Sequence, residues 1–89
     1  MRFEWDEAKR RGNLRKHGVD FPDAVAVLED PNNRTFEDPD AEDEVRYITL
    51  GMSVSLTLLI VVWTERTRDI IRIISARPAS KGEAHQYSK

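Results

Sequence analysis

The sequence contains no cysteine, and it has only four glycines and four prolines among 89 residues. Without cysteine there is no disulfide framework, no thiolate metal site and no cysteine nucleophile, and the redox compartment stays undetermined. The glycines form neither a phosphate-binding loop nor a G-x-S-x-G nucleophile elbow. These absences exclude the common motifs of nucleotide-binding proteins and serine hydrolases.

Long hydrophobic runs are also missing. The two longest apolar stretches have roughly 7–8 residues each, which suits strands and is far too short to cross a bilayer. No apolar segment of a secretory signal stands near the N-terminus. We therefore expect a cytoplasmic protein without membrane contact. With 39% hydrophobic and 34% charged residues, we expect one globular domain over residues 1–89.

Charge is segregated along the chain although the formal net charge is only −2. Half of the 16 acidic residues lie between Glu29 and Glu44, where Arg34 is the sole basic residue. Basic residues outnumber acidic ones both in residues 1–19 and in residues 45–89. Two interpretations follow: an anion-binding face for nucleic acid, or an ordinary solvated surface.

The segment 56–77 organises the rest of the chain. Valine, isoleucine, threonine and tryptophan dominate it, as they do on a buried pleated surface. A polar break over residues 64–69 divides it into two strands of a β-hairpin. Four arginines lie in or beside these strands: Arg66, Arg68, Arg72 and Arg77.

Helices are predicted on both sides of the strand region. Asp6 and Gly18 bound a basic helix over residues 7–17. A second helix begins near Phe21 and ends before Asp30-Pro31, and the capping box Ser80-x-x-Glu83 opens a short helix to Tyr87. Residues 45–52 form a strand, residues 34–36 fit a brief edge strand, and residues 2–5 are a first strand or an extended arm.

The order of these elements predicts an α+β fold. It has two N-terminal helices, an antiparallel sheet of three to four strands and a short C-terminal helix, with the helices packed on one face of the sheet.

Few residues are able to carry chemistry. They are the two histidines His17 and His85, Lys9, the arginines, and some carboxylates and tyrosines. No metal-ligand spacing appears, and the acidic segment lacks the glycine-bearing calcium-loop pattern. We therefore predict no metal and no cofactor. Cations with one or two imidazoles suit phosphodiester cleavage, in which the 2′-OH of RNA attacks its own phosphate and arginines stabilise the phosphorane.

In an ideal strand, Arg72 and Arg77 point to opposite faces. They share a site only if a bulge or the end of the strand redirects one of them. Arg72 is either a functional residue or an arginine that lies along the sheet or pairs with a carboxylate.

The sequence resembles the BrnT toxins of bacterial type II toxin–antitoxin systems. The similarity rests on F-E-W-D at residues 3–6, Lys9, N-x-x-K-H-G-V at residues 13–19, T-E-R at residues 64–66, and R-I-I-S-A-R at residues 72–77 followed by E-x-x-x-Y. These motifs run over essentially the whole chain, in the same order and with similar spacing.

The resemblance implies a RelE-like ribonuclease that arrests translation and is neutralised by a small BrnA-type antitoxin. In that family the antitoxin carries a ribbon-helix-helix part, and the complex represses its own operon. Contact with operator DNA is therefore expected only through the antitoxin, in a hetero-oligomer.

By position, the resemblance makes Lys9, His17, Arg66 and Arg77 the candidate catalytic residues, with His17 as the proton-transfer group. The alternative for His17 is that it simply ends its helix. The candidate RNA-binding residues are Trp5, Arg72, Glu83 and Tyr87. The alternative for Trp5 is a position in the core. The alternative for Glu83 and Tyr87 is that they orient an arginine, and a further alternative for Tyr87 is that it packs on the sheet.

Two other functions stay open. Apolar sheet positions exceed what two short helices cover, which favours an antitoxin-binding module that acts mainly in operon autoregulation. The third hypothesis is a nucleic-acid binder without catalysis, which would show salt-dependent RNA binding and no cleavage products.

Overall fold

A computed structural model describes residues 1–87 of the chain. The elements in chain order are β1 (Arg2–Glu4), α1 (Glu7–His17), α2 (Phe21–Glu29), β2 (Arg34–Glu37), β3 (Tyr47–Met52), β4 (Leu58–Thr67), β5 (Ile70–Pro78) and α3 (Lys81–Tyr87). The strands form one sheet in the order β1-β5-β4-β3-β2. In this sheet β1 runs parallel to β5, and the other neighbours are antiparallel.

The helix boundaries follow the capping residues. Asp6 accepts a hydrogen bond from the backbone N–H of Lys9, and Gly18 ends α1 in the left-handed conformation with φ 71°. Asp20 caps α2, and Asp30 ends it. In α3, the backbone N–H of Glu83 donates to Ser80 Oγ, and the carboxylate of Glu83 accepts from the N–H of Ser80. The three predicted helices are therefore confirmed.

The prediction of three to four strands is wrong, and so is the prediction that all neighbouring strands are antiparallel. The structure has five strands, because residues 2–4 pair with residues 70–72 and residues 34–37 pair with residues 47–50. The edge strand predicted at residues 34–36 is present as β2, and β1 is the fifth strand. Both are short, and pairing with the neighbouring strand stabilises them. The predicted break at residues 64–69 is also too long, since β4 continues to Thr67 and β5 begins at Ile70.

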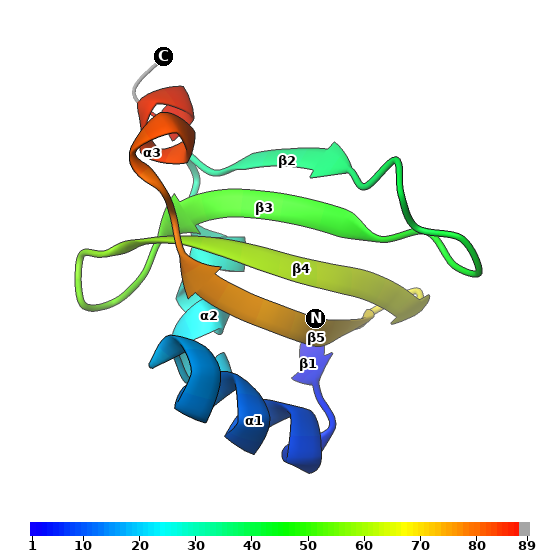
Figure 1. Cartoon of the computed structure of the whole chain (residues 1–89). Coiled ribbons are helices and arrows are strands. Elements are labelled where there is room, and N and C mark those ends of the chain that lie inside the picture. Colours follow the sequence, from blue (N-terminus) through cyan, green and yellow to red (C-terminus); the bar gives the residue numbers. More distant parts are fainter. Residues whose placement is uncertain (88–89) are drawn as a thin grey trace.

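The helices lie on both faces of the sheet and not on one, as Figure 1 shows. Helices α1 and α2 cover one face, where Phe21, Val27, Val61 and Ile73 are almost completely buried. Helix α3 lies on the other side, next to β3. We call this other side the open face, because α3 covers only one end of it. No helix within residues 1–87 is long and apolar enough to span a membrane.

Candidate functional site

A β-bulge in β5 determines which arginines lie on the open face. Ser75 is opposite Val62, whereas Ile73 is opposite Trp63, so Ile74 is an extra residue without a partner of its own. Residues directly opposite each other share a face of the sheet. Ile73 belongs to the core beneath the helices. The register therefore places Ser75 on the open face.

Both arginines of β5 lie on that same face. Arg77 is opposite Ile60 and Arg72 is opposite Thr64, two positions to either side of Val62. Without the extra residue in β5, the two arginines would point to opposite faces. The bulge therefore brings Arg72, Ser75 and Arg77 to the same face of the sheet, which an ideal strand would not do.

Each of these arginines is held by a carboxylate. Arg72 Nε donates to Glu4 Oε2 at 2.7 Å, from the neighbouring strand β1. Arg77 donates through both terminal nitrogens to Glu83 of α3, at 2.8 and 2.7 Å. Hydrogen bonding from Arg77 is the main cause that lowers the pKa of Glu83 to about 2, and the Glu83 carboxylate in turn raises the pKa of Arg77. Two oriented guanidinium groups thus lie on the open face.

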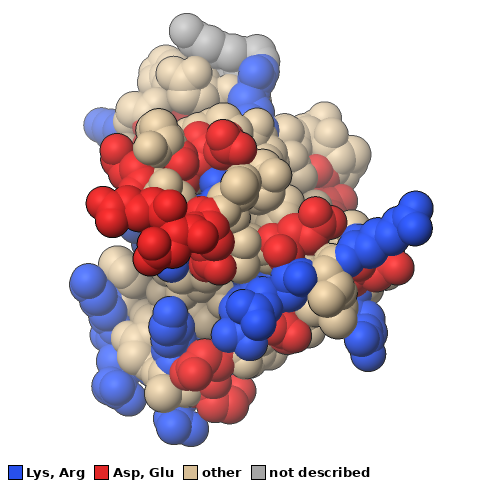
Figure 2. All heavy atoms as spheres, turned by 90° about the vertical axis from the view of Figure 1, so that its right-hand side faces the viewer, with Lys and Arg blue, Asp and Glu red and all other residues tan. Residues whose placement is uncertain are grey.

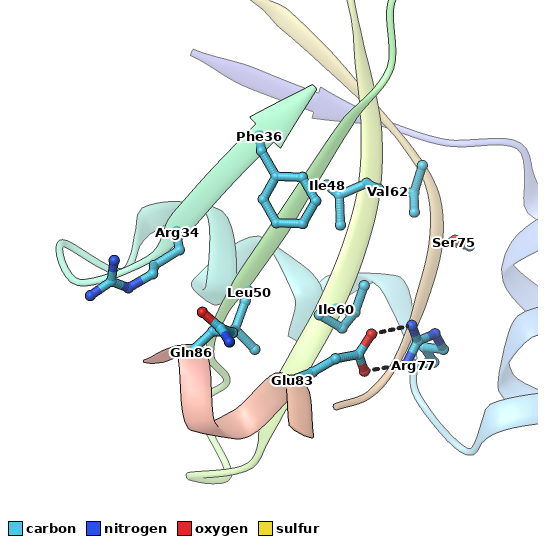
Figure 3. A pocket seen from close by; sticks show the side chains of 10 residues that line it. All are labelled: Arg34, Phe36, Ile48, Leu50, Ile60, Val62, Ser75, Arg77, Glu83 and Gln86. Carbon is cyan, nitrogen blue, oxygen red and sulfur yellow. Dashed lines mark hydrogen bonds and ion pairs between the residues drawn. The ribbon is translucent and has the colours of Figure 1, made fainter. Parts of the chain in front are cut away.

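Beside Arg77 the open face is hollowed into a groove of about 530 Å³ (Figure 3). Apolar side chains from β2, β3 and β4 form its surface, and polar side chains stand around them. The lining residues are Arg34, Phe36, Ile48, Leu50, Ile60, Val62, Ser75, Arg77, Glu83 and Gln86. The groove thus joins one guanidinium to a mostly apolar surface.

Helix α3 closes one end of this groove and is anchored twice. The Arg77–Glu83 pair holds its first turn. The hydroxyl of Tyr87 donates to Asp30 Oδ2 at 2.6 Å at the end of α2. Burial opposes ionisation of Asp30, but hydrogen bonds from Tyr87 and from the backbone of Met52 and Asn32 lower its pKa. Glu83 and Tyr87 therefore fix α3 on the sheet.

The four candidate catalytic residues do not converge at one place. Lys9 and His17 belong to α1, which packs on the helical side of the sheet. His17 is half-buried in a hollow of about 170 Å³ that it shares with Thr57 and Pro78. Arg66 is exposed near the β4–β5 turn, at the opposite end of the hairpin from Arg77. Among these four residues, Arg77 alone lines the groove.

Trp5 also lies on the helical side. Its ring meets Phe21 edge to face, with 6.1 Å between ring centroids, and its Nε1 donates to Glu7. Trp5 packs against the core, which is the alternative to RNA binding for this residue. It is therefore not part of the groove.

Charge is uneven at the end of the molecule opposite α3. Figure 2 shows carboxylates gathered on the upper part of this end, with lysine and arginine side chains below and to the right. Five acidic residues lie in the acidic loop (residues 38–44) between β2 and β3, and Arg46 pairs with Glu44 there. Within residues 1–87, no three His, Cys, Asp or Glu side chains gather in a group able to hold a metal ion.

Comparison with known proteins agrees with the motifs and the fold. A family model described as "Ribonuclease toxin, BrnT, of type II toxin-antitoxin system" matches residues 5–83. The chain belongs to the BrnT family. The crystal structure of the Brucella abortus ribonuclease toxin BrnT is similar, with a TM-score of 0.73 and 28% sequence identity. The match covers 91% of this chain and 99% of that chain, whereas no curated protein sequence matched. As a type II toxin, a BrnT protein implies an antitoxin partner.

Asn13, in the N-x-x-K-H-G-V motif of this BrnT chain, has a role that sequence reasoning missed. It is buried in α1, and its amide donates to the carbonyls of Val19 and Ala76 at 2.9 and 2.7 Å. It also accepts from the N–H of Ala76. Asn13 therefore fastens α1 to β5 just beyond the bulge. The available signal was an asparagine in the middle of a helix, where that residue is unfavourable.

Glu4 and Ser75 were also missed as residues of the open face. Their positions depend on the pairing of β1 and on the bulge in β5. Sequence reasoning predicted residues 2–5 only as a strand or an arm and left the bulge open, so it identified neither residue.

Proposed function

We propose that this BrnT-family chain is a metal-independent endoribonuclease with a RelE-like mode of action, which arrests translation in the cytoplasm and is neutralised by a BrnA-type antitoxin. One observation carries the proposal. Arg72 and Arg77 lie on the same open face, and each is oriented by a carboxylate. Paired guanidinium groups recognise phosphate and stabilise charge that develops on it.

The reaction needs no redox partner. The 2′-oxygen of RNA attacks the adjacent phosphorus, the bond from phosphorus to the 5′-oxygen breaks, and a 2′,3′-cyclic phosphate and a 5′-hydroxyl result. A base takes the proton of the 2′-OH, and an acid gives one to the leaving 5′-oxygen. Arg77 stabilises the additional negative charge of the phosphorane, and Arg72, farther along the same face, contacts a neighbouring phosphate.

His17 is the proposed proton-transfer group, although it lies beyond the end of β5. It shares its hollow with Pro78, the residue after Arg77. RNA that passes round this end of the sheet meets Arg77 on one side and His17 on the other. Lys9 and Arg66 are then outer contacts to the RNA backbone, away from the scissile phosphate.

Induced expression in bacteria tests the proposal. We expect wild type to arrest growth with fragmentation of RNA, and Arg77→Ala and His17→Ala to relieve both. Purified Arg77→Ala should cleave RNA at least tenfold more slowly because a charge-stabilising group is lost, and EDTA should leave wild-type cleavage unchanged. Arg68→Ala is the matched control, since Arg68 is an exposed arginine at the β4–β5 turn, and it should cleave like wild type. Absence of arrest and fragments with folded wild type would refute the nuclease.

The second candidate function is an antitoxin-binding module in operon autoregulation. The apolar groove favours it, because such a surface suits a protein segment. This alternative predicts repression of the operon by the complex and no RNA fragments from the toxin alone.

A further inference from the structure

We propose that the groove beside β2 binds an antitoxin segment that has apolar side chains followed by lysine or arginine residues. The apolar side chains occupy the surface formed by Phe36, Ile48 and Val62, and the cations lie over the acidic loop. The inference deepens the proposed function and rests on it for the identity of the partner as an antitoxin.

The apolar part of the surface is incompletely covered. Phe36 is 56% exposed, and Ile48 and Val62 beside it are half-buried. These three side chains form one row across β2, β3 and β4, because Phe36 is opposite Ile48 and Ile48 is opposite Val62. Figure 3 shows them side by side at the end of the groove away from α3. An aromatic ring bordered by aliphatic side chains is the kind of surface on which a partner anchors.

The flank of the groove also suits an extended segment. Strand β2 is an edge of the sheet, and all four of its residues are exposed. An edge strand presents backbone N–H and C=O groups to which another chain can add a strand. A segment that pairs with β2 would place alternate side chains beside Phe36, on the same face of the sheet.

The acidic loop predicts which charge the partner segment carries at the end of the groove away from α3. The loop leaves β2 directly after the Phe36 row, where the N–H of Asp38 donates to the carbonyl of Arg46 at 2.7 Å. Five carboxylates project from seven residues, and Arg46 balances only one of them by an ion pair. This end attracts cations and repels the phosphates of RNA. A protein segment with basic residues therefore fits here better than a nucleic acid.

The same segment would block the nuclease site. The row that follows the Phe36 row toward α3 consists of Arg34, Leu50, Ile60 and Arg77. A chain that leaves the β2 edge and crosses the sheet along this row would cover Arg77. Antitoxin and RNA would then exclude each other without any change of conformation in the toxin.

The test measures binding of the purified cognate antitoxin, from the neighbouring reading frame, to toxin variants by calorimetry. We expect Phe36→Asp to weaken binding at least tenfold, since it places a charge on the apolar surface. Glu42→Lys with Asp43→Lys should also weaken it tenfold at low salt, and less at high salt. Circular dichroism confirms the fold of each variant.

Matched controls separate this groove from general surface effects. Val54→Asp changes an apolar residue that is 71% exposed outside the groove, and Glu29→Lys with Asp69→Lys makes the same change of net charge elsewhere. Both controls should bind within twofold of wild type. Wild-type affinity in Phe36→Asp and in the loop variant would overturn the proposal.

Dimer formation by the toxin alone and RNA cleavage by the free toxin are measured as well. If the toxin alone forms a dimer that Phe36→Asp abolishes while antitoxin binding persists, the groove is an interface between two copies and the proposal is wrong. Cleavage of RNA by the free toxin is measured separately. Absence of cleavage would refute the nuclease function, whereas loss of antitoxin binding in the groove variants would still support the docking surface.

Discussion

The bidentate contact between Arg77 and Glu83 links the proposed chemistry to the position of α3. It orients the guanidinium of β5, and it holds the first turn of the last helix. The two side chains are 42% and 34% exposed, so solvent screens the pair. Its contribution to stability is therefore modest, and its main effect is orientation.

The lowered pKa of Glu83 predicts a defined pH dependence. The pKa is about 2 in the folded chain against an ordinary 4.5, so the ionised pair stabilises the fold above pH 4.5 and this contribution is lost as the pH falls toward 2. We expect Glu83→Gln to lower the free energy of unfolding by about 0.5–1 kcal/mol at pH 7, and the difference from wild type to vanish near pH 2.

Urea denaturation between pH 2 and pH 7 provides the measurement. Glu29→Gln, at an exposed residue of α2, should not differ from wild type in this pH-dependent way. A difference for Glu83→Gln that is the same at all pH values would mean that the carboxylate charge is not the cause.

At the scale of elements, the close packing of α2 on β3 depends on one glycine. A Cβ atom at Gly51 would lie 2.9 Å from both Val27 Cγ1 and the carbonyl oxygen of Val27. The backbone of α2 would therefore have to move away from the sheet. Gly51 is buried, and this contact determines how near the helix approaches the strand.

Gly51→Ala should consequently destabilise the protein by about 1–3 kcal/mol through overpacking. Gly82→Ala is the control, because its Cβ would meet no atom within 4 Å in α3. That substitution should raise stability by up to about 1 kcal/mol through helix propensity. Thermal unfolding of both variants gives the comparison, and equal effects at the two positions would contradict the packing argument.

For the molecule as a whole, the arrangement of charge matters more than the net charge of −2. Carboxylates gather in the acidic loop, and two oriented arginines lie on the open face, paired with Glu4 of β1 and Glu83 of α3. A slightly acidic protein can thus present oriented guanidinium groups to RNA, since screening limits the influence of the acidic loop to about 8 Å at physiological salt.

The salt dependence of RNA binding follows from this arrangement. Each phosphate contact to single-stranded RNA contributes about 0.7 to the slope of log K against log salt concentration. With a 2′-O-methyl RNA oligomer, which has no attacking hydroxyl, Arg72→Ala and Arg77→Ala should each reduce the slope by about 0.7. Arg68→Ala should leave it unchanged. Equal slopes for all three variants would place the RNA elsewhere.

The sequence alone determined the family and the three helices. Asp6, Gly18, Asp20 and the Ser80–Glu83 capping box act on backbone groups within a few residues, so their effect is local and readable. The motifs that resemble BrnT toxins span most of the chain, and the family model confirms them.

Tertiary structure decided the sheet and the site. Strand β1 exists only through pairing with residues almost 70 positions away, and the bulge at Ile74 depends on how β5 pairs with β4 and packs under α1. These features put Arg72 beside Glu4, put Arg77 beside Glu83, and leave His17 on the other side of the sheet. Capping acts over three or four residues, whereas the direction of a side chain from a strand depends on register, which only the assembled sheet defines.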